Sequence, residues 1–319
     1  QNYVMLLVSF VLMYLAIVKK FEPLLLLPIA FGMFLINLPG AYDVLWGRYP
    51  SESEPTWILN EATGLWEKVT SLPHTYENVL PESRGLLWYL FYGVQNVIYP
   101  PLIFLGIGAM TDFGPLIANP KSMFIGAAAQ LGIFLALILA VVFGFDLAAA
   151  CSIAIIGGAD GPTAIYVTQT LAKFTNEDLL SAIAIAAYSY MALIPIIQKP
   201  LMRALVPKKE RAIRMKQLRT VSKLEKIVFP IAVTLIVGIL LPAAIPLLGM
   251  LMLGNLLKES CVTERLSSQA QNGLMNTITI FLGVSVGCKA FGAVFLTWST
   301  LKIVALGLMA FICGTIGGL

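Results

Sequence analysis

The sequence predicts an all-α integral membrane protein, a polytopic helix bundle with inverted repeats and discontinuous, re-entrant helices. Of its 319 residues, 58% are hydrophobic and only 12% are charged, whereas soluble domains carry about 25% charged residues. The mean hydropathy is +0.85. The apolar runs are long and continuous, unlike the alternating segments of about ten residues in a membrane barrel. We therefore expect residues 1–319 to form a single membrane domain that has no nucleic-acid partner.

The apolar runs predict transmembrane helices over residues 3–18, 22–38, 85–110, 123–145 and 180–197. No basic segment precedes the first run and no small-residue cleavage site follows it, so it is expected to be a helix rather than a signal peptide. The chain stops at Leu319 inside an apolar run. This ending predicts that the sequence is incomplete at its C-terminus.

Charge placement predicts the orientation of the chain. Ten of the 21 Lys and Arg residues lie in residues 199–226, and loops this rich in positive charge stay cytoplasmic. We expect this basic segment between the two halves to face lipid headgroups, a soluble partner, or both. Residues 41–84 hold three basic and seven acidic residues and are expected to form an extracytoplasmic polar loop.

The same orientation predicts a re-entrant segment. If residues 147–171 crossed the membrane once, the span over 180–197 would deliver the basic segment to the outside, against the charge rule. A hairpin that enters and leaves by one face removes this conflict. The sequence around Asp160, GGADGP, supports the hairpin because glycine weakens a helix and proline removes a backbone donor.

Asp160 is the strongest candidate for a functional residue. An ionised aspartate at mid-bilayer costs about 2.5–3.5 kcal/mol, so such a residue needs a cation, a proton or a polar partner. Broken helices present oxygen atoms to ions near the midplane, and Thr163 adds a hydroxyl oxygen for a hard cation such as Na⁺. The alternative is a carboxylate that hydrogen-bonds to nearby backbone amides and only maintains the break.

A second polar group of residues lies late in the chain. Asn276 and Thr279 fall on one face of the predicted helix, and Ser285 follows them. The alternative is a helix–helix contact made by small residues with polar side chains between them. Upstream, residues 246–257, which include Asn255, resemble residues 101–112, as expected of an inverted repeat. Tyr190 belongs to a Tyr-Ser-Tyr sequence that forms a polar path in an otherwise apolar helix.

These motifs resemble the membrane-embedded beta subunit of the biotin-dependent, sodium-translocating decarboxylases, a family that acts on oxaloacetate, methylmalonyl-CoA or glutaconyl-CoA. The resemblance covers nearly the whole chain, and the aspartate motif is specific. The loop over residues 41–84 and Lys199 depart from the family pattern. The matching stretches are KKFEPLLLLPIAFG (19–32), PPLIFLGIGAMTDFGPLIANPK (100–121), IIGGADGPTAIYV (155–167), AIAAYSYMALIPIIQ (184–198), ERAIRMKQLR (210–219) and NTITIFLGVSVG (276–287).

The resemblance implies a subunit that decarboxylates carboxybiotin on a carrier protein, consumes a proton and exports Na⁺ across a prokaryotic cytoplasmic (inner) membrane. It implies a homotrimer with a mobile core and a scaffold, and three partners: a biotin carrier subunit or domain, a carboxyltransferase alpha subunit and a small gamma membrane subunit. It assigns catalysis to Asp160 and Tyr190. Residues expected to bind Na⁺ are Asp160, Asn276, Ser285, Thr163 and Asn255.

Two lysines, Lys199 and Lys289, are candidates to attract the carboxylate of carboxybiotin, although a cation at a helix end is usually a snorkelling anchor. Two other functions fit parts of the same pattern. A stand-alone Na⁺/H⁺ exchanger would have a similar broken helix but would need no biotinylated partner. A purely structural membrane anchor does not explain why the chain keeps Asp160 in lipid. The acid that the complex decarboxylates does not follow from this sequence.

Overall fold

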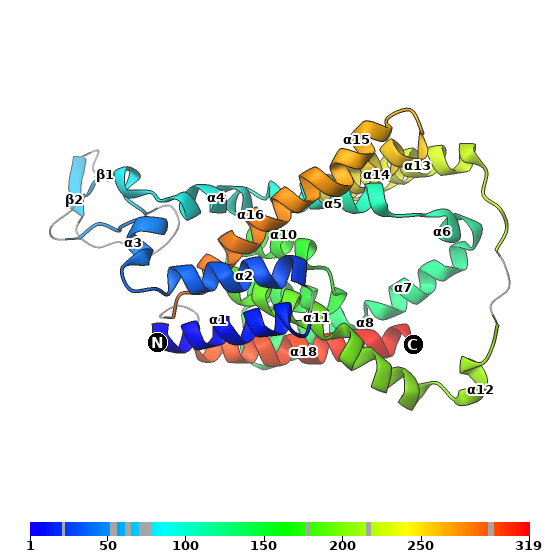
Figure 1. The fold of residues 1–319 in the computed structure, drawn as a ribbon, viewed down its shortest axis with the longest axis horizontal. Coiled ribbons are helices and arrows are strands. Elements are labelled where there is room, and N and C mark those ends of the chain that lie inside the picture. Colours follow the sequence, from blue (N-terminus) through cyan, green and yellow to red (C-terminus); the bar gives the residue numbers. More distant parts are fainter. Residues whose placement is uncertain are drawn as a thin grey trace.

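The computed structural model describes residues 1–20, 23–51, 56–60, 65–69, 78–175, 179–214, 218–292 and 297–319, and these residues are mainly helical (Figure 1). One antiparallel pair of strands, β1 (Thr56–Asn60) and β2 (Leu65–Val69), lies in the polar segment 41–84. The helices of the first half are α1 (Asn2–Ile17), α2 (Pro23–Ile36), α3 (Ala41–Leu45), α4 (Leu86–Gln95), α5 (Tyr99–Met110), α6 (Gly114–Ala118), α7 (Met123–Ala129) and α8 (Leu131–Val142).

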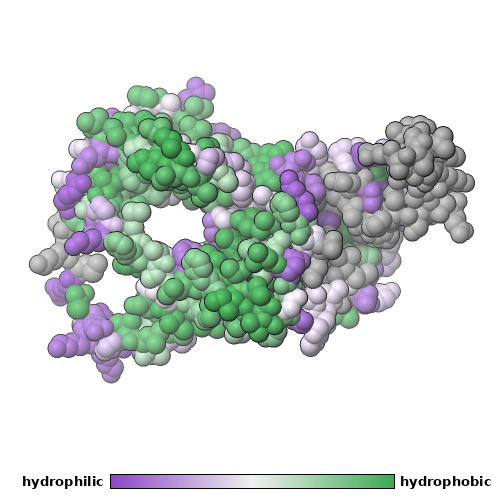
Figure 2. Space-filling view, turned by 180° about the vertical axis from the view of Figure 1, so that it is seen from behind, coloured by the Kyte–Doolittle hydropathy of each residue, from purple (hydrophilic) through white to green (hydrophobic). Residues whose placement is uncertain are grey.

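The remaining helices are α9 (Leu147–Ala154), α10 (Gly161–Leu171), α11 (Leu180–Leu205), α12 (Lys208–Arg211), α13 (Lys223–Leu240), α14 (Ile245–Glu259), α15 (Glu264–Gln269), α16 (Met275–Cys288) and α18 (Trp298–Gly318). Among the described residues, two helical segments are long and apolar enough to cross a membrane, Pro120–Val142 and Trp298–Gly318. Large apolar side chains cover much of the surface, including Ile239 at 73% exposure, and Figure 2 shows these hydrophobic areas on one face. An apolar exterior of this kind suits lipid as the surrounding solvent.

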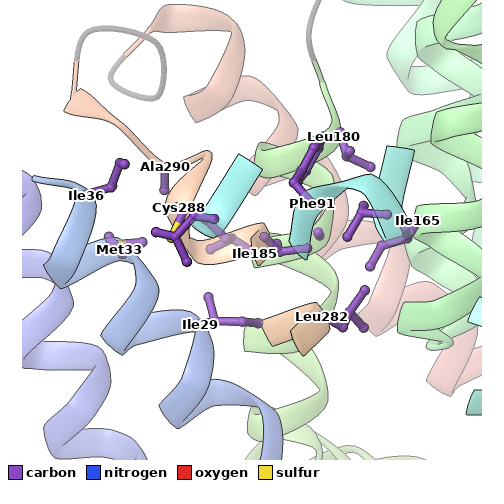
Figure 3. Packing of buried hydrophobic residues seen from close by; sticks show 14 of the residues in the cluster. Ile29, Met33, Ile36, Phe91, Ile165, Leu180, Ile185, Leu282, Cys288 and Ala290 are labelled. Carbon is purple, nitrogen blue, oxygen red and sulfur yellow. The ribbon is translucent and has the colours of Figure 1, made fainter. Parts of the chain in front are cut away.

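The helices pack around two apolar cores. The first bundle is built from α1, α2, α4, α5 and α16, with α14 packed on α5, and Figure 3 shows part of its core, where Ile29 of α2 and Leu282 of α16 lie near each other. The second bundle is built from α8, α9, α11 and α18, with Ile153 and Leu306 in its core. Both α10 and α11 contribute side chains to each core. These two helices therefore join the bundles.

The chain enters the second bundle through a hairpin made by α9, the short 3₁₀ turn η3 (Ile155–Gly158) and α10. Asp146 caps the first turn of α9, and Thr175 follows the end of α10. The Thr175 hydroxyl donates a 2.8 Å hydrogen bond to the Asp146 carboxylate, so both ends of the hairpin lie on one side. The predicted hairpin is confirmed.

The span predicted over residues 85–110 is not one continuous helix, because α4 and α5 meet at an angle of 69°. The α-helical bond runs from the N–H of one residue to the carbonyl four positions earlier. Pro100 and Pro101 have no N–H, so the carbonyls of Asn96 and Val97 lose their helical donors. Val97 also adopts a left-handed conformation, with φ of 58°. The paired prolines thus account for a second broken helix.

The two segments that resemble each other in sequence, in α5 and α14, pack directly against one another. A Cβ added at Gly108 would lie 2.7 Å from the Leu251 carbonyl carbon, and one added at Gly254 would lie 3.0 Å from the Leu105 carbonyl carbon. These distances are too short for any side chain. The contact is reciprocal, as an internal two-fold axis would require; the inverted repeat itself stays a prediction.

Charged residues near α12 and α13 fall into two groups. In residues 218–226, Arg219 pairs with Glu225 at 3.1 Å, and Lys226 lies between Asp112 at 3.3 Å and Glu259 at 3.4 Å. In residues 199–214, six cations are exposed and form no ion pair with any described residue: Lys199, Arg203, Lys208, Lys209, Arg211 and Arg214. The excess positive charge of the basic segment is therefore concentrated in its first part.

Candidate functional site

The hairpin breaks at Asp160. Ala159 takes a left-handed conformation with φ of 55°, and Asp160 is extended, which ends η3 and starts α10 in a new direction. The Asp160 carboxylate accepts hydrogen bonds from the Thr163 hydroxyl at 2.5 Å and from the Thr163 backbone amide at 3.4 Å. Pro162, at the second helical position, adds no unsatisfied donor to this exposed helix start. Asp160 is thus the N-cap of α10.

Asp160 lies inside the bundle without a fixed positive partner among the described residues. Its carboxylate keeps acceptor capacity beyond the two bonds from Thr163, because an ionised carboxylate has about four lone-pair sites. Asp160 and Thr163, both predicted as cation ligands, are hydrogen-bonded to each other, and the bond from the Thr163 amide fits the alternative in which Asp160 maintains the break. Capping accounts for part of the role of Asp160 but leaves its negative charge without compensation in a low-dielectric environment.

A pocket of about 350 Å³ lies beside the break, between the first bundle and the tip of the hairpin. Pro162 of α10 and Tyr188 of α11 form one side of it. Asn276 and Thr279 of α16 lie on another side, so the predicted polar face of this helix does border the candidate site. The other lining residues are apolar side chains of α2, α5 and α16: Leu24, Leu25, Ile103, Ile107, Met275 and Ile280.

Tyr188, the first tyrosine of the Tyr-Ser-Tyr sequence, holds the break in position. Its side chain is buried, and a Cβ added at Gly161 would lie within 2.8 Å of three carbon atoms of its ring. No residue other than glycine fits at position 161 without movement of the ring. The only signal in the sequence was the Tyr-Ser-Tyr pattern, which did not say which tyrosine faces the aspartate motif.

Tyr190 faces the other way. Its hydroxyl donates a hydrogen bond to the Val304 carbonyl of α18, and its ring packs against Gly307 of the same helix. Side chains two residues apart on a helix point about 200° from each other. Tyr188 therefore packs in the first core and Tyr190 in the second. Among the described residues, no hydrogen bond joins Tyr190 to Asp160.

Asn276 and Ser285 cannot be ligands of one ion in this conformation. They are nine residues apart in α16, which corresponds to about 13.5 Å along the axis and to opposite faces of the helix. Asn276 is exposed toward the pocket, whereas Ser285 is fully buried and its hydroxyl donates to the Phe281 carbonyl. A single site formed by Asp160, Asn276 and Ser285 is therefore not present.

Asn255 has a different environment from the one expected. It is 1% exposed, and its side-chain amide donates to the carbonyls of Thr111 at 3.0 Å and Gly108 at 3.4 Å. These bonds join α14 to the C-terminal end of α5, whose last carbonyls have no helical donors. This geometry gives Asn255 a packing role between two helices of the first bundle.

The two candidate lysines lie at opposite ends of the molecule, so they cannot hold the same carboxylate. Lys289, at the end of α16, lies 5.3 Å from the ring centre of Trp46 and 5.1 Å from that of Phe91, at the end of the molecule that carries α3. Lys199 is exposed near the end of α11, toward α12 (Figure 1). Cation–π contacts at this distance explain why Lys289 is held in place.

Together, the discontinuous hairpin, the carboxylate at its break and the adjoining pocket are typical of membrane transport proteins that bind their cargo at broken helices. Residues 1–319 match the family described as the Na⁺-transporting oxaloacetate decarboxylase beta subunit, and the chain belongs to this family. The predicted resemblance is confirmed. Membership supports the decarboxylase interpretation over the stand-alone exchanger.

The names of similar proteins agree with this assignment. The chain is 52% identical over 316 residues to the methylmalonyl-CoA decarboxylase subunit beta of Propionigenium modestum, covering 99% of this chain and 76% of the relative. It is 49% identical over 317 residues to the glutaconyl-CoA decarboxylase subunit beta of Acidaminococcus fermentans, with 99% and 74% covered. A probable oxaloacetate decarboxylase beta chain of Vibrio cholerae is 49% identical over 342 residues, with 99% and 78% covered.

Proposed function

We propose that this chain decarboxylates carboxybiotin on a carrier protein and uses this reaction to export Na⁺ with consumption of one proton. The observation that carries the proposal is the Asp160 carboxylate, which lies at the break of a re-entrant hairpin with no fixed cation among the described residues. A carboxylate in this environment favours a mobile cation, and the family assignment supports Na⁺ as that cation.

In this proposal, Na⁺ binds to Asp160 and to the hydroxyl oxygen of Thr163, both of which are oxygen ligands that suit a hard cation. Asn276 adds its amide oxygen from the α16 side of the pocket. Asn255 and Ser285 support the packing of the first bundle instead. Tyr190 moves a proton between the second bundle and the reaction, for which its hydroxyl must leave the Val304 carbonyl.

We further infer that residues 199–226 face the cytoplasm and that residues 41–84 face the outside of a prokaryotic inner membrane. Helix α3, in the first of the outer residues, and helix α12, in the basic segment, lie at opposite ends of the molecule in Figure 1, as this orientation requires. The exposed cations of residues 199–214 would contact the carrier or the carboxyltransferase, since they form no ion pairs with the described residues. A gamma membrane subunit and two further copies of this chain complete the proposed complex. The acid is oxaloacetate, methylmalonyl-CoA or glutaconyl-CoA, and another subunit selects it.

The test measures CO₂ release from carboxybiotin by the reconstituted complex while Na⁺ is titrated, for the wild type and for Asp160→Asn. We expect Na⁺-stimulated CO₂ release and radiolabelled Na⁺ movement in the wild type, with both lost in the variant. Coupled activity that survives in the variant would contradict the assignment of Asp160. Cation flux that needs no biotin would instead place the protein among the exchangers.

A further inference from the structure

A polar side chain interrupts a long apolar span. Gln130 lies between α7 and α8, near the middle of the membrane-long segment Pro120–Val142. It is exposed, and among the described residues no hydrogen bond involves its side-chain amide. About 13.5 Å of helix separates it from Lys121, at 1.5 Å per residue, and hydrocarbon at that depth offers an amide no hydrogen-bond partner. Gln130 therefore needs water, an ion or another polar group beside it.

The Gln130 amide adjoins the tip of the hairpin. Its Oε1 atom lies 3.5 Å from the position of a Cβ added at Gly158. Asp160 is two residues further along the chain, so its Cα lies within about 7.6 Å of the Gly158 Cα. The two backbones also meet closely, since a Cβ added at Gly157 would lie 2.9 Å from the Gly132 carbonyl carbon. This packing of α8 against η3 holds Gln130 next to the aspartate motif.

The tip of the hairpin has an exposed side. Ala159 is exposed and Asp160 is only partly buried, although the pocket bordered by Pro162 and Tyr188 includes neither of them. Figure 2 shows an opening through the molecule, which by its place in Figure 1 lies between α5, α7 and the helices of the hairpin. These features indicate an approach to Asp160 that is separate from the pocket.

From these observations, and resting on the proposed function, we propose that Gln130 lines the route by which Na⁺ reaches Asp160. The amide oxygen of Gln130 replaces part of the water shell of the ion, because hard cations accept carbonyl oxygen as a ligand. The amide is neutral, so it binds the ion weakly enough for the ion to leave, as conduction through several sites requires. Gln130 is thus an access residue, whereas the Asp160 carboxylate holds the ion.

The first test asks whether position 130 meets water or lipid. Gln130→Cys is made in a chain whose native cysteines are replaced by serine, and the complete complex is reconstituted in vesicles. A charged methanethiosulfonate reagent labels thiolates in water but not thiols in hydrocarbon. Met309→Cys is the matched control, because Met309 is 44% exposed near the middle of α18. We expect position 130 to be labelled at least tenfold faster, and equal rates would overturn the proposal by placing Gln130 in lipid.

The second test follows CO₂ release during a Na⁺ titration in the chain with its native cysteines. Because slower entry matters most when Na⁺ is scarce, we expect Gln130→Leu to raise the half-saturating Na⁺ concentration at least fivefold. Release at saturating Na⁺ should stay within about twofold of the wild type, and Gln130→Asn, which keeps the amide, should recover part of the change. An unchanged half-saturation point would overturn the proposal, and so would an equal loss at every Na⁺ concentration, which indicates a purely structural role. Absence of biotin-dependent CO₂ release in the wild type would refute the proposed function instead.

Discussion

Gly161→Ala tests whether the Tyr188 ring fixes the position of the Asp160 break. Three ring carbon atoms would lie within 2.8 Å of the new Cβ, although ordinary contact begins at 3.4 Å. The nearest ring carbon must return to ordinary contact, so the ring or the start of α10 must move by about 1.3 Å, and overpacking of this kind costs about 1–3 kcal/mol. At about 1.4 kcal/mol per tenfold change, the population with the native break falls by about 5- to 140-fold.

The assay follows Na⁺-stimulated CO₂ release together with thermal unfolding in detergent. We expect Gly161→Ala to lose activity by one to two orders of magnitude, and we expect the added change Tyr188→Leu to recover part of it by removing the ring. Gly126→Ala is the matched control, since Gly126 lies in α7 with nothing within 4 Å of an added Cβ. Full activity in Gly161→Ala would refute the inference that this contact sets the site.

Three further substitutions test other parts of the structure. Hydrogen bonds from the Ala149 amide and the Thr175 hydroxyl lower the pKa of Asp146 below its ordinary value. Asp146→Ala removes an N-cap and should therefore lower the free energy of unfolding by about 1 kcal/mol. This loss should be present at every pH above about 4, where the carboxylate is ionised. The difference in melting temperature between the wild type and Asp146→Ala should narrow as the pH falls through the lowered pKa of Asp146. A difference that changes between pH 5 and 8 would contradict this explanation. Asn255→Leu should lower stability by about 1–2 kcal/mol without moving the Na⁺ half-saturation point, whereas a shifted half-saturation point would return Asn255 to the cation site. Tyr190→Phe should keep Na⁺ binding and reduce CO₂ release by about 10²-fold if its hydroxyl moves the proton; an unchanged rate would leave it a packing residue.

The hairpin could be predicted from the sequence because two independent constraints agreed. The charge rule required an even number of passages between residues 145 and 180, and the glycines and proline around Asp160 allowed a break there. The break between α4 and α5 was missed, although Pro100 and Pro101 carry its signal. Both prolines also occur normally in the first turn of a helix, so they mark a break only when the preceding helix is known to end at Gln95.

The composition of the site could be predicted less well than its location. The residue types at Asn276 and Ser285 both suit a cation, but their spacing of nine residues places them on opposite faces of α16. Tyr188 and Tyr190 are chemically equal in the sequence, and only the packing of α11 between two cores distinguishes them. Such contacts depend on tertiary packing, which residue types and local spacing do not specify.

The contact between α5 and α14 bears on the predicted inverted repeat. A shift of 146 positions relates Leu105 to Leu251 and Gly108 to Gly254, and it also relates Ala109 to Asn255. An added Cβ at Gly254 would lie 2.8 Å from the Ala109 nitrogen, and one at Gly108 would lie 3.1 Å from the Asn255 nitrogen. The backbone contact is therefore nearly symmetric, but the side chains are not. Alanine cannot repeat the bonds that the Asn255 amide makes to α5, so only the end of α5 is held by a partner's amide.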